Sequence, residues 1–177
     1  SLRRYLVIFQ NQHELRPTGG FMGSFAVIDV QKGKIVGVEV PGGGTYDLQG
    51  QLSEFVKPPL PLQLVNSRWE FQDANWFPDF PSAAKKMMWF YEHGRGVSVD
   101  GVIAVNASVL EDVLAVLKSL EAPEAPNVIL TSGSAVGTLE ANIRIASEAK
   151  SRQPKALIGQ LFTSVLGRLE HLSPYEA

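Results

Sequence analysis

Two stretches of the sequence hold the side chains best suited to chemistry, and the first is a glycine-containing loop at residues 16–24. There Arg16 and Thr18 stand directly before Gly19 and Gly20. A guanidinium beside exposed glycine amides supplies hydrogen-bond donors without competing acceptors, which suits an oxyanion or a phosphate. The alternative interpretation is a tight turn in which Arg16 pairs with a carboxylate.

The second stretch, residues 73–82, combines carboxylates, an amide and aromatic rings. Asp73 and Asp79 flank Asn75, and hard cations such as Mg²⁺ prefer carboxylate and amide oxygens. Alternatively, the two aspartates are capping residues that hold an aromatic loop in shape. Trp76 and its aromatic neighbours indicate a stacking surface for a sugar, an apolar wall for a lipid, or part of the core. We expect the two stretches to meet over one edge of a sheet.

Composition limits the classes of function. With 177 residues, 45% of them hydrophobic and 19% charged, the chain is predicted to form one globular domain over residues 1–177. The net charge of -2 argues against a nucleic-acid partner held by bulk electrostatics. The absence of cysteine excludes disulfides, thiolate metal sites and a cysteine nucleophile. The histidines, His171 among them, show no zinc-binding spacing, so no metal ligand is assigned.

Hydrophobic patterning predicts the elements that position these stretches. The apolar run at 5–10 indicates a strand buried on both faces, and 21–30 with 34–40 predict a hairpin. The remaining predictions are a short helix within 49–56, a helix at 82–93 with Asp79 as its N-cap, a strand at 101–105, a helix from 109 to 120 closed by the prolines of 122–126, a short strand or loop at 128–130, and helices at 139–150 and 154–170. A hairpin followed by a strand–helix–strand crossover predicts an α/β fold, a mixed β-sheet sandwiched by helices.

Several short motifs, in order, resemble the bacterial domain of unknown function 4012 family. They are Tyr5 to Asn11, Glu14 to Phe21, Asp73 to Trp76 with Pro78 to Pro81, and Asp100 to Ala104. Together these motifs span most of the chain. The resemblance implies an extracytoplasmic protein of the cell envelope, anchored to the cytoplasmic membrane by a segment outside these residues.

A more remote similarity is to the LytR-CpsA-Psr family, whose α/β-sandwich enzymes transfer glycopolymers from polyprenyl-pyrophosphate lipids to peptidoglycan. Arg16 matches the arginine of that family's Arg-x-Asp-Thr motif, although Thr18 replaces the aspartate. Val40-Pro41 matches the start of its Ile-Pro-Arg-Asp motif, but two glycines replace the charged pair. Arg152-Gln153, before an apolar stretch, is similar to its Arg-Gln segment. The similarity implies a LytR-CpsA-Psr-like fold that keeps two arginines for a pyrophosphate and lacks the acidic positions for magnesium.

The resulting prediction is a domain that binds an anionic polyprenyl-pyrophosphate-linked glycan or a related envelope ligand. Transfer of the glycopolymer and a magnesium cofactor are left open, because transfer needs both a cation and a positioned base. The candidate ligand-binding residues are Arg16, Thr18, Gly19, Gly20, Asp73, Asn75, Trp76, Asp79 and Arg152. The alternative hypothesis is a non-catalytic protein-interaction module of the envelope that uses the proline-rich segment and Trp89-Phe90. A hydrolase with a metal at the two aspartates ranks last.

Overall fold

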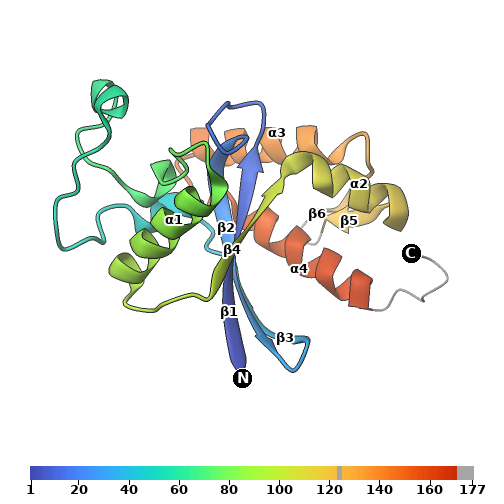
Figure 1. Ribbon diagram of the computed structural model, residues 1–177. Coiled ribbons are helices and arrows are strands. Elements are labelled where there is room, and N and C mark those ends of the chain that lie inside the picture. The colour runs from blue at the N-terminus through green and yellow to red at the C-terminus, as the bar shows by residue number, and fades with distance from the viewer. Residues whose placement is uncertain (123–124, 171–177) are drawn as a thin grey trace.

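A mixed four-stranded sheet forms the centre of the computed structural model, which describes residues 1–122 and 125–170 (Figure 1). Its strands are β1 (Leu2–Asn11), β2 (Phe21–Gln31), β3 (Lys34–Glu39) and β4 (Gly101–Asn106), in the order β3-β2-β1-β4. β2 is antiparallel to both of its neighbours, whereas β4 runs parallel to β1. The predicted mixed sheet is confirmed. Because β1 and β4 are parallel, their carboxyl ends lie at the same edge of the sheet.

The predicted hairpin is formed by β2 and β3. Between these strands Lys32 and Gly33 have φ angles of 52° and 77°. Two successive residues with positive φ are typical of the tight turns whose twist matches that of the flanking strands. At the other end of β2, antiparallel pairing with β1 places Phe21, the first residue of β2, beside Asn11.

The two faces of the sheet pack against different helices (Figure 1). On one face, Leu6 and Ile8 of β1 join a core with Met87 of α1 (Phe80–Arg95). On the other face, Val7 belongs to a cluster that includes Phe162 of α4 (Ala156–Glu170). Alternate residues of β1 are thus buried on opposite faces, as the apolar run predicts.

The second face carries additional elements around α4. They are α2 (Ala107–Leu117), α3 (Ala135–Glu148) and a hairpin of β5 (Leu120–Ala122) with β6 (Ala125–Leu130). Leu114 of α2, Leu130 of β6 and Leu161 of α4 are buried in a common cluster. This layer of helices forms one wall of the site described below.

Two predicted elements differ from the structure. No helix forms within 49–56, because Gly50 has a φ of 75°; the helical turn lies earlier, at η1 (Gly44–Leu48). The helix predicted to reach residue 120 ends at Leu117, because Lys118 takes a φ of 68° and Leu120 starts β5. Residues 123 and 124, within the predicted proline-rich end of that helix, and residues 171–177, with His171, lie outside the described residues.

The predicted cap of α1 is confirmed, since the Asp79 carboxylate accepts a hydrogen bond from the Ser82 amide at 3.0 Å. That bond holds the pKa of Asp79 below its ordinary value. The side chain therefore has a structural function at the start of α1.

We expect Asp79→Ala to lower the free energy of unfolding in urea at pH 7, and Asp79→Ser, which retains a capping oxygen, to restore most of it. A lowered carboxyl pKa stabilises the folded state above the ordinary pKa, and this contribution is lost as the pH falls through the folded-state pKa. The difference between wild type and Asp79→Ala should therefore shrink on acidification below about pH 4. Equal stability of the two proteins at pH 7 would contradict the capping role.

Candidate functional site

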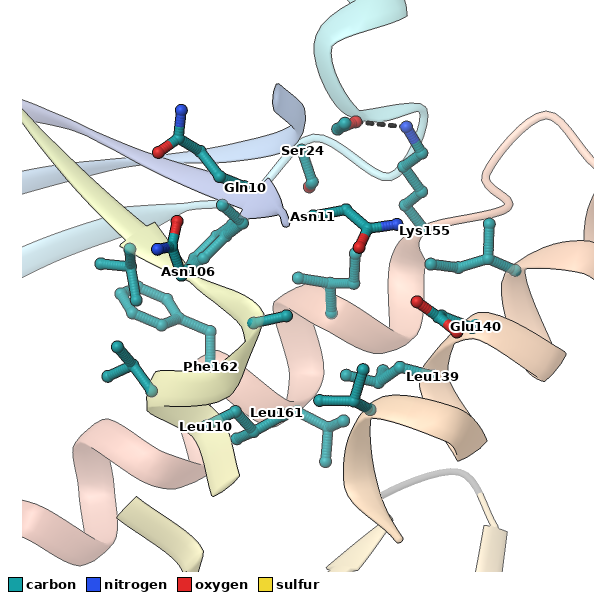
Figure 2. Close-up of a pocket in the computed structure, with 18 of the residues that line it drawn as sticks. Gln10, Asn11, Ser24, Asn106, Leu110, Leu139, Glu140, Lys155, Leu161 and Phe162 are labelled. Atoms are coloured by element: carbon teal, nitrogen blue, oxygen red, sulfur yellow. Dashed lines mark hydrogen bonds between the residues drawn. The ribbon is translucent and has the colours of Figure 1, made fainter. Parts of the chain in front are cut away.

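One of two cavities near the carboxyl ends of β1 and β4 has a volume of about 640 Å³ and lies between the sheet and α2, α3 and α4 (Figure 2). We call it the apolar cavity. Its volume is within the range of small-molecule sites. Most of its lining is aliphatic or aromatic, and includes Phe9, Val105, Leu110, Val113, Leu139, Ile143, Ile158, Leu161, Phe162 and Leu166.

A lysine lies at the polar end of the apolar cavity. The Lys155 ammonium donates a hydrogen bond to the Gly23 carbonyl, and Figure 2 shows its side chain directed away from Leu110, Leu139 and Leu161. Burial lowers the pKa of Lys155, while the nearby charges of Glu14 and Asp47 act in the opposite direction. Within residues 1–122 and 125–170, no carboxylate forms a salt bridge with this ammonium. Lys155 also directly precedes α4, at the positive end of the helix dipole, where an anion is favoured over a cation.

A buried hydroxyl lines the same cavity. The Ser24 side chain is 1% exposed, and its Oγ has no hydrogen-bond partner in the described part of the chain. A buried polar group without a partner costs roughly 1–3 kcal/mol. Ser24 and Lys155 therefore form a polar end of the cavity that is prepared for a further polar group.

The second cavity, of about 670 Å³, lies beside the loop between β1 and β2, and we call it the polar cavity. It brings together four of the predicted site residues: Arg16, Asp73, Asn75 and Trp76. Burial raises the pKa of Asp73, against the effects of Arg16 and of a hydrogen bond from Asn66 Nδ2 at 2.7 Å. The two predicted stretches thus meet at one edge of the sheet, as expected.

Asn75 joins those two stretches. Its Nδ2 donates to the Gly20 carbonyl at 2.8 Å and to Thr18 Oγ1 at 3.0 Å. Gln10 Nε2 also donates to Thr18 Oγ1, at 2.6 Å. A Cβ at Gly20 would lie 2.4 Å from the Asn11 carbonyl oxygen, so only glycine fits there. Thr18 and Gly20 therefore shape and hold the loop.

One of the two glycine amides of the phosphate-clamp hypothesis is already engaged, because the Gly19 amide donates to the Arg16 carbonyl at 2.9 Å. Gly19 has a φ of 119°, which completes the turn. The Arg16 guanidinium forms no salt bridge with any described residue; it donates to the Leu15 carbonyl at 3.0 Å. The loop is therefore the tight turn of the alternative interpretation, without the carboxylate partner.

Phe21 lines both cavities. Its ring centroid is 5.1 Å from the Arg16 guanidinium carbon and 5.9 Å from Lys155 Nζ, which also lies 5.3 Å from the ring centroid of Tyr46. The two cavities therefore adjoin at one aromatic ring, with a cation bordering each.

Five of the nine predicted residues line neither cavity. Three of them, Thr18, Gly19 and Gly20, belong to the turn described above. The others are Asp79, which caps α1, and Arg152, which is exposed in the segment before α4. Lys155, three residues after Arg152, was not predicted as a site residue. A signal was present, because a basic residue directly before an apolar helix opposes the helix dipole. Among the residues that the structure describes, no three His, Asp or Glu side chains gather as a metal site.

No helix in the described ranges is long and apolar enough to cross a membrane. No curated protein and no solved structure shows significant similarity to the chain. The model of the family described as "Protein of unknown function (DUF4012)" matches residues 2–143. This match includes β1 to β4, the turn that holds Arg16 and the segment from Asp73 to Asp79. Because it covers most of the sequence, the chain belongs to the DUF4012 family.

Proposed function

We propose that this domain binds an anionic polyprenyl-pyrophosphate-linked glycan, or a related lipid-linked ligand of the bacterial envelope, outside the cytoplasmic membrane. The observation that carries the proposal is a partly buried lysine, Lys155, at the polar end of a large apolar cavity. Each CH₂ of a bound hydrocarbon chain gains about 0.8 kcal/mol when it leaves water. A cavity lined by aliphatic side chains with a cation at one end therefore matches an amphiphile with an anionic head.

The head group would lie where the donors converge. Lys155 lacks a carboxylate partner among the described residues, and the Ser24 hydroxyl is buried without a partner. Phosphate oxygens accept charge-assisted hydrogen bonds from ammonium and guanidinium groups. Because the Arg16 guanidinium carbon and Lys155 Nζ lie 5.1 and 5.9 Å from the Phe21 ring centroid, a pyrophosphate beside this ring would lie near two cations.

The distant resemblance to the LytR-CpsA-Psr family supports the same ligand class. The features shared with that family are the mixed sheet flanked by helices and an arginine in the loop, Arg16 in this chain. We propose that the fold is LytR-CpsA-Psr-like. The extracytoplasmic location and the membrane anchor rest on the family resemblance alone.

Binding without transfer is the form of this function that the site supports best. Asp73 is the one carboxylate among the side chains that line the polar cavity, and Arg16 lines it too. Mg²⁺ prefers several oxygen ligands with carboxylates among them, and a nearby guanidinium opposes a cation. The residues of the polar cavity therefore fit magnesium poorly, and no reaction step is assigned to it.

The alternative, a non-catalytic interaction module, has one observation in its favour. On the proline-rich segment Leu60 and Leu64 are 79% and 88% exposed, next to the polar cavity. The other surface suggested for a partner, at Trp89-Phe90, is largely occupied by contacts within the domain. Phe90 is buried, and the Trp89 ring stacks on the His93 ring with 4.1 Å between the ring centroids.

We expect a short-chain polyprenyl diphosphate at a hundred times its Kd to stabilise the wild type by about 2.7 kcal/mol in a thermal-shift titration. Leu139→Trp, which fills the apolar cavity, should lose this shift. Ile145→Trp is the matched control, because Ile145 lies on the same helix, is 62% exposed and does not line the cavity. Equal shifts for both variants, or no shift for the wild type, would overturn the proposal. Repeating the titration with Mg²⁺ tests whether the cation takes part.

A further inference from the structure

Two of the residues that line the polar cavity carry buried hydrogen-bond acceptors. Asn75 Oδ1 and Gln72 Oε1 have no partner in the described part of the chain, and their side chains are 1% and 6% exposed. Because Asn75 Nδ2 donates to Gly20 and Thr18, its oxygen is the atom left without a partner. Buried acceptors of this kind are normally satisfied. A ligand that donates hydrogen bonds would satisfy both oxygens.

Aromatic rings line the same cavity. Trp76, Tyr46 and Phe21 are part of its lining. The C–H faces of a sugar ring pack against such surfaces, while its hydroxyls donate to amide and carboxylate oxygens. The volume of about 670 Å³ is within the range of sites that hold a small molecule of this size.

Other ligand classes match this lining less well. An anion would meet three groups that offer acceptor oxygens: Gln72, Asp73 and Asn75. A divalent cation would find one carboxylate, with Arg16 on the lining as well. A neutral polyhydroxyl compound matches both the acceptors and the rings.

We propose that the polar cavity is a saccharide-binding site, in which the side-chain oxygens of Gln72, Asp73 and Asn75 accept from sugar hydroxyls and Trp76 packs against the ring. The inference that this site holds the glycan of a lipid-linked ligand rests on the proposed function. The binding of free sugars to the site is tested independently of that function.

The test is saturation-transfer NMR with glucose, N-acetylglucosamine, cellobiose and maltose at millimolar concentration. We expect at least one of these sugars to bind the wild type saturably, and Gln72→Met to weaken that binding about tenfold. Met is close to Gln in length, and removing an acceptor without a partner should not destabilise the fold. Gln31→Met, an exposed position at the end of β2, is the matched control and should bind as the wild type does.

Trp76→Leu is the second variant and should also lose the signal. The site is overturned if none of the four sugars binds the wild type, which would leave ordered water as the partner of the acceptors. It is also overturned if a sugar binds and Gln72→Met and Trp76→Leu both retain wild-type affinity. Leu139→Trp, which alters a residue that lines the apolar cavity and not the polar cavity, should leave sugar binding unchanged. Sugar binding without lipid binding would reject the proposed function and keep this site; the reverse result would reject this site alone.

Discussion

Asn75→Asp is expected to lower the free energy of unfolding by roughly 2–4 kcal/mol at pH 7, although the two side chains have nearly the same shape. The wild-type Nδ2 donates to the Gly20 carbonyl and to Thr18 Oγ1, at 2.8 and 3.0 Å. A carboxylate would direct an oxygen at the Gly20 carbonyl and lose that donor. It would also place a charge in a side chain that is 1% exposed.

Urea unfolding at several pH values measures this effect. Because burial favours the neutral carboxyl, the deficit of Asn75→Asp should decrease as the pH falls toward 4. Asn142→Asp, on the exposed side of α3, is the control and should change the stability little. If Asn75→Asp is as stable as the wild type, then Asn75 does not hold the two loops together.

The sheet was predictable because its strands carry local signals. The apolar run of β1 has buried residues on both faces, and the turn at Lys32 and Gly33 is short and contains glycine. The segment from residue 41 to η3 (Phe71–Asp73) carried weaker signals, since its conformation depends on tertiary contacts. One example is the Thr45 hydroxyl, which donates to the Met22 carbonyl at 2.9 Å.

The site was predictable in part. The loops of Arg16 and Asn75 combine residue types that point to function, and they do meet. The hydrogen bond between Asn75 and Thr18 joins residues 57 positions apart, and that pairing was expected only in outline. The apolar cavity was not predicted, because its walls look like ordinary core faces of amphipathic helices until the packing leaves a space between them. Lys155 meets Gly23 across 132 positions, a contact that no local pattern specifies.

Lys155→Met is expected to weaken the binding of a polyprenyl diphosphate at least tenfold, and to leave the ligand-free protein as stable as the wild type or more so at pH 7. The loss of affinity follows from removing a charge-assisted donor to phosphate at the polar end of the apolar cavity.

The stability follows from burial, which lowers the pKa of Lys155 and so makes its charged form unfavourable in the folded state. This penalty is fully present below the folded-state pKa and is relieved as the pH rises toward the ordinary value of 10.5. Urea unfolding should accordingly show the wild type gaining stability relative to Lys155→Met between pH 7 and pH 10.

Arg152→Met is the matched control, because it removes a cation from the same segment at an exposed position that lines neither cavity. The resemblance to the LytR-CpsA-Psr family favours Arg152 as the phosphate ligand, whereas the geometry favours Lys155. A loss confined to Lys155→Met places the head group inside the apolar cavity. A loss confined to Arg152→Met places the phosphates outside it, in the segment before α4, and the cavity would then require another explanation. If neither variant changes the affinity, the anionic head does not reach α4, and the lipid-linked ligand must be abandoned even if the polar cavity binds sugars.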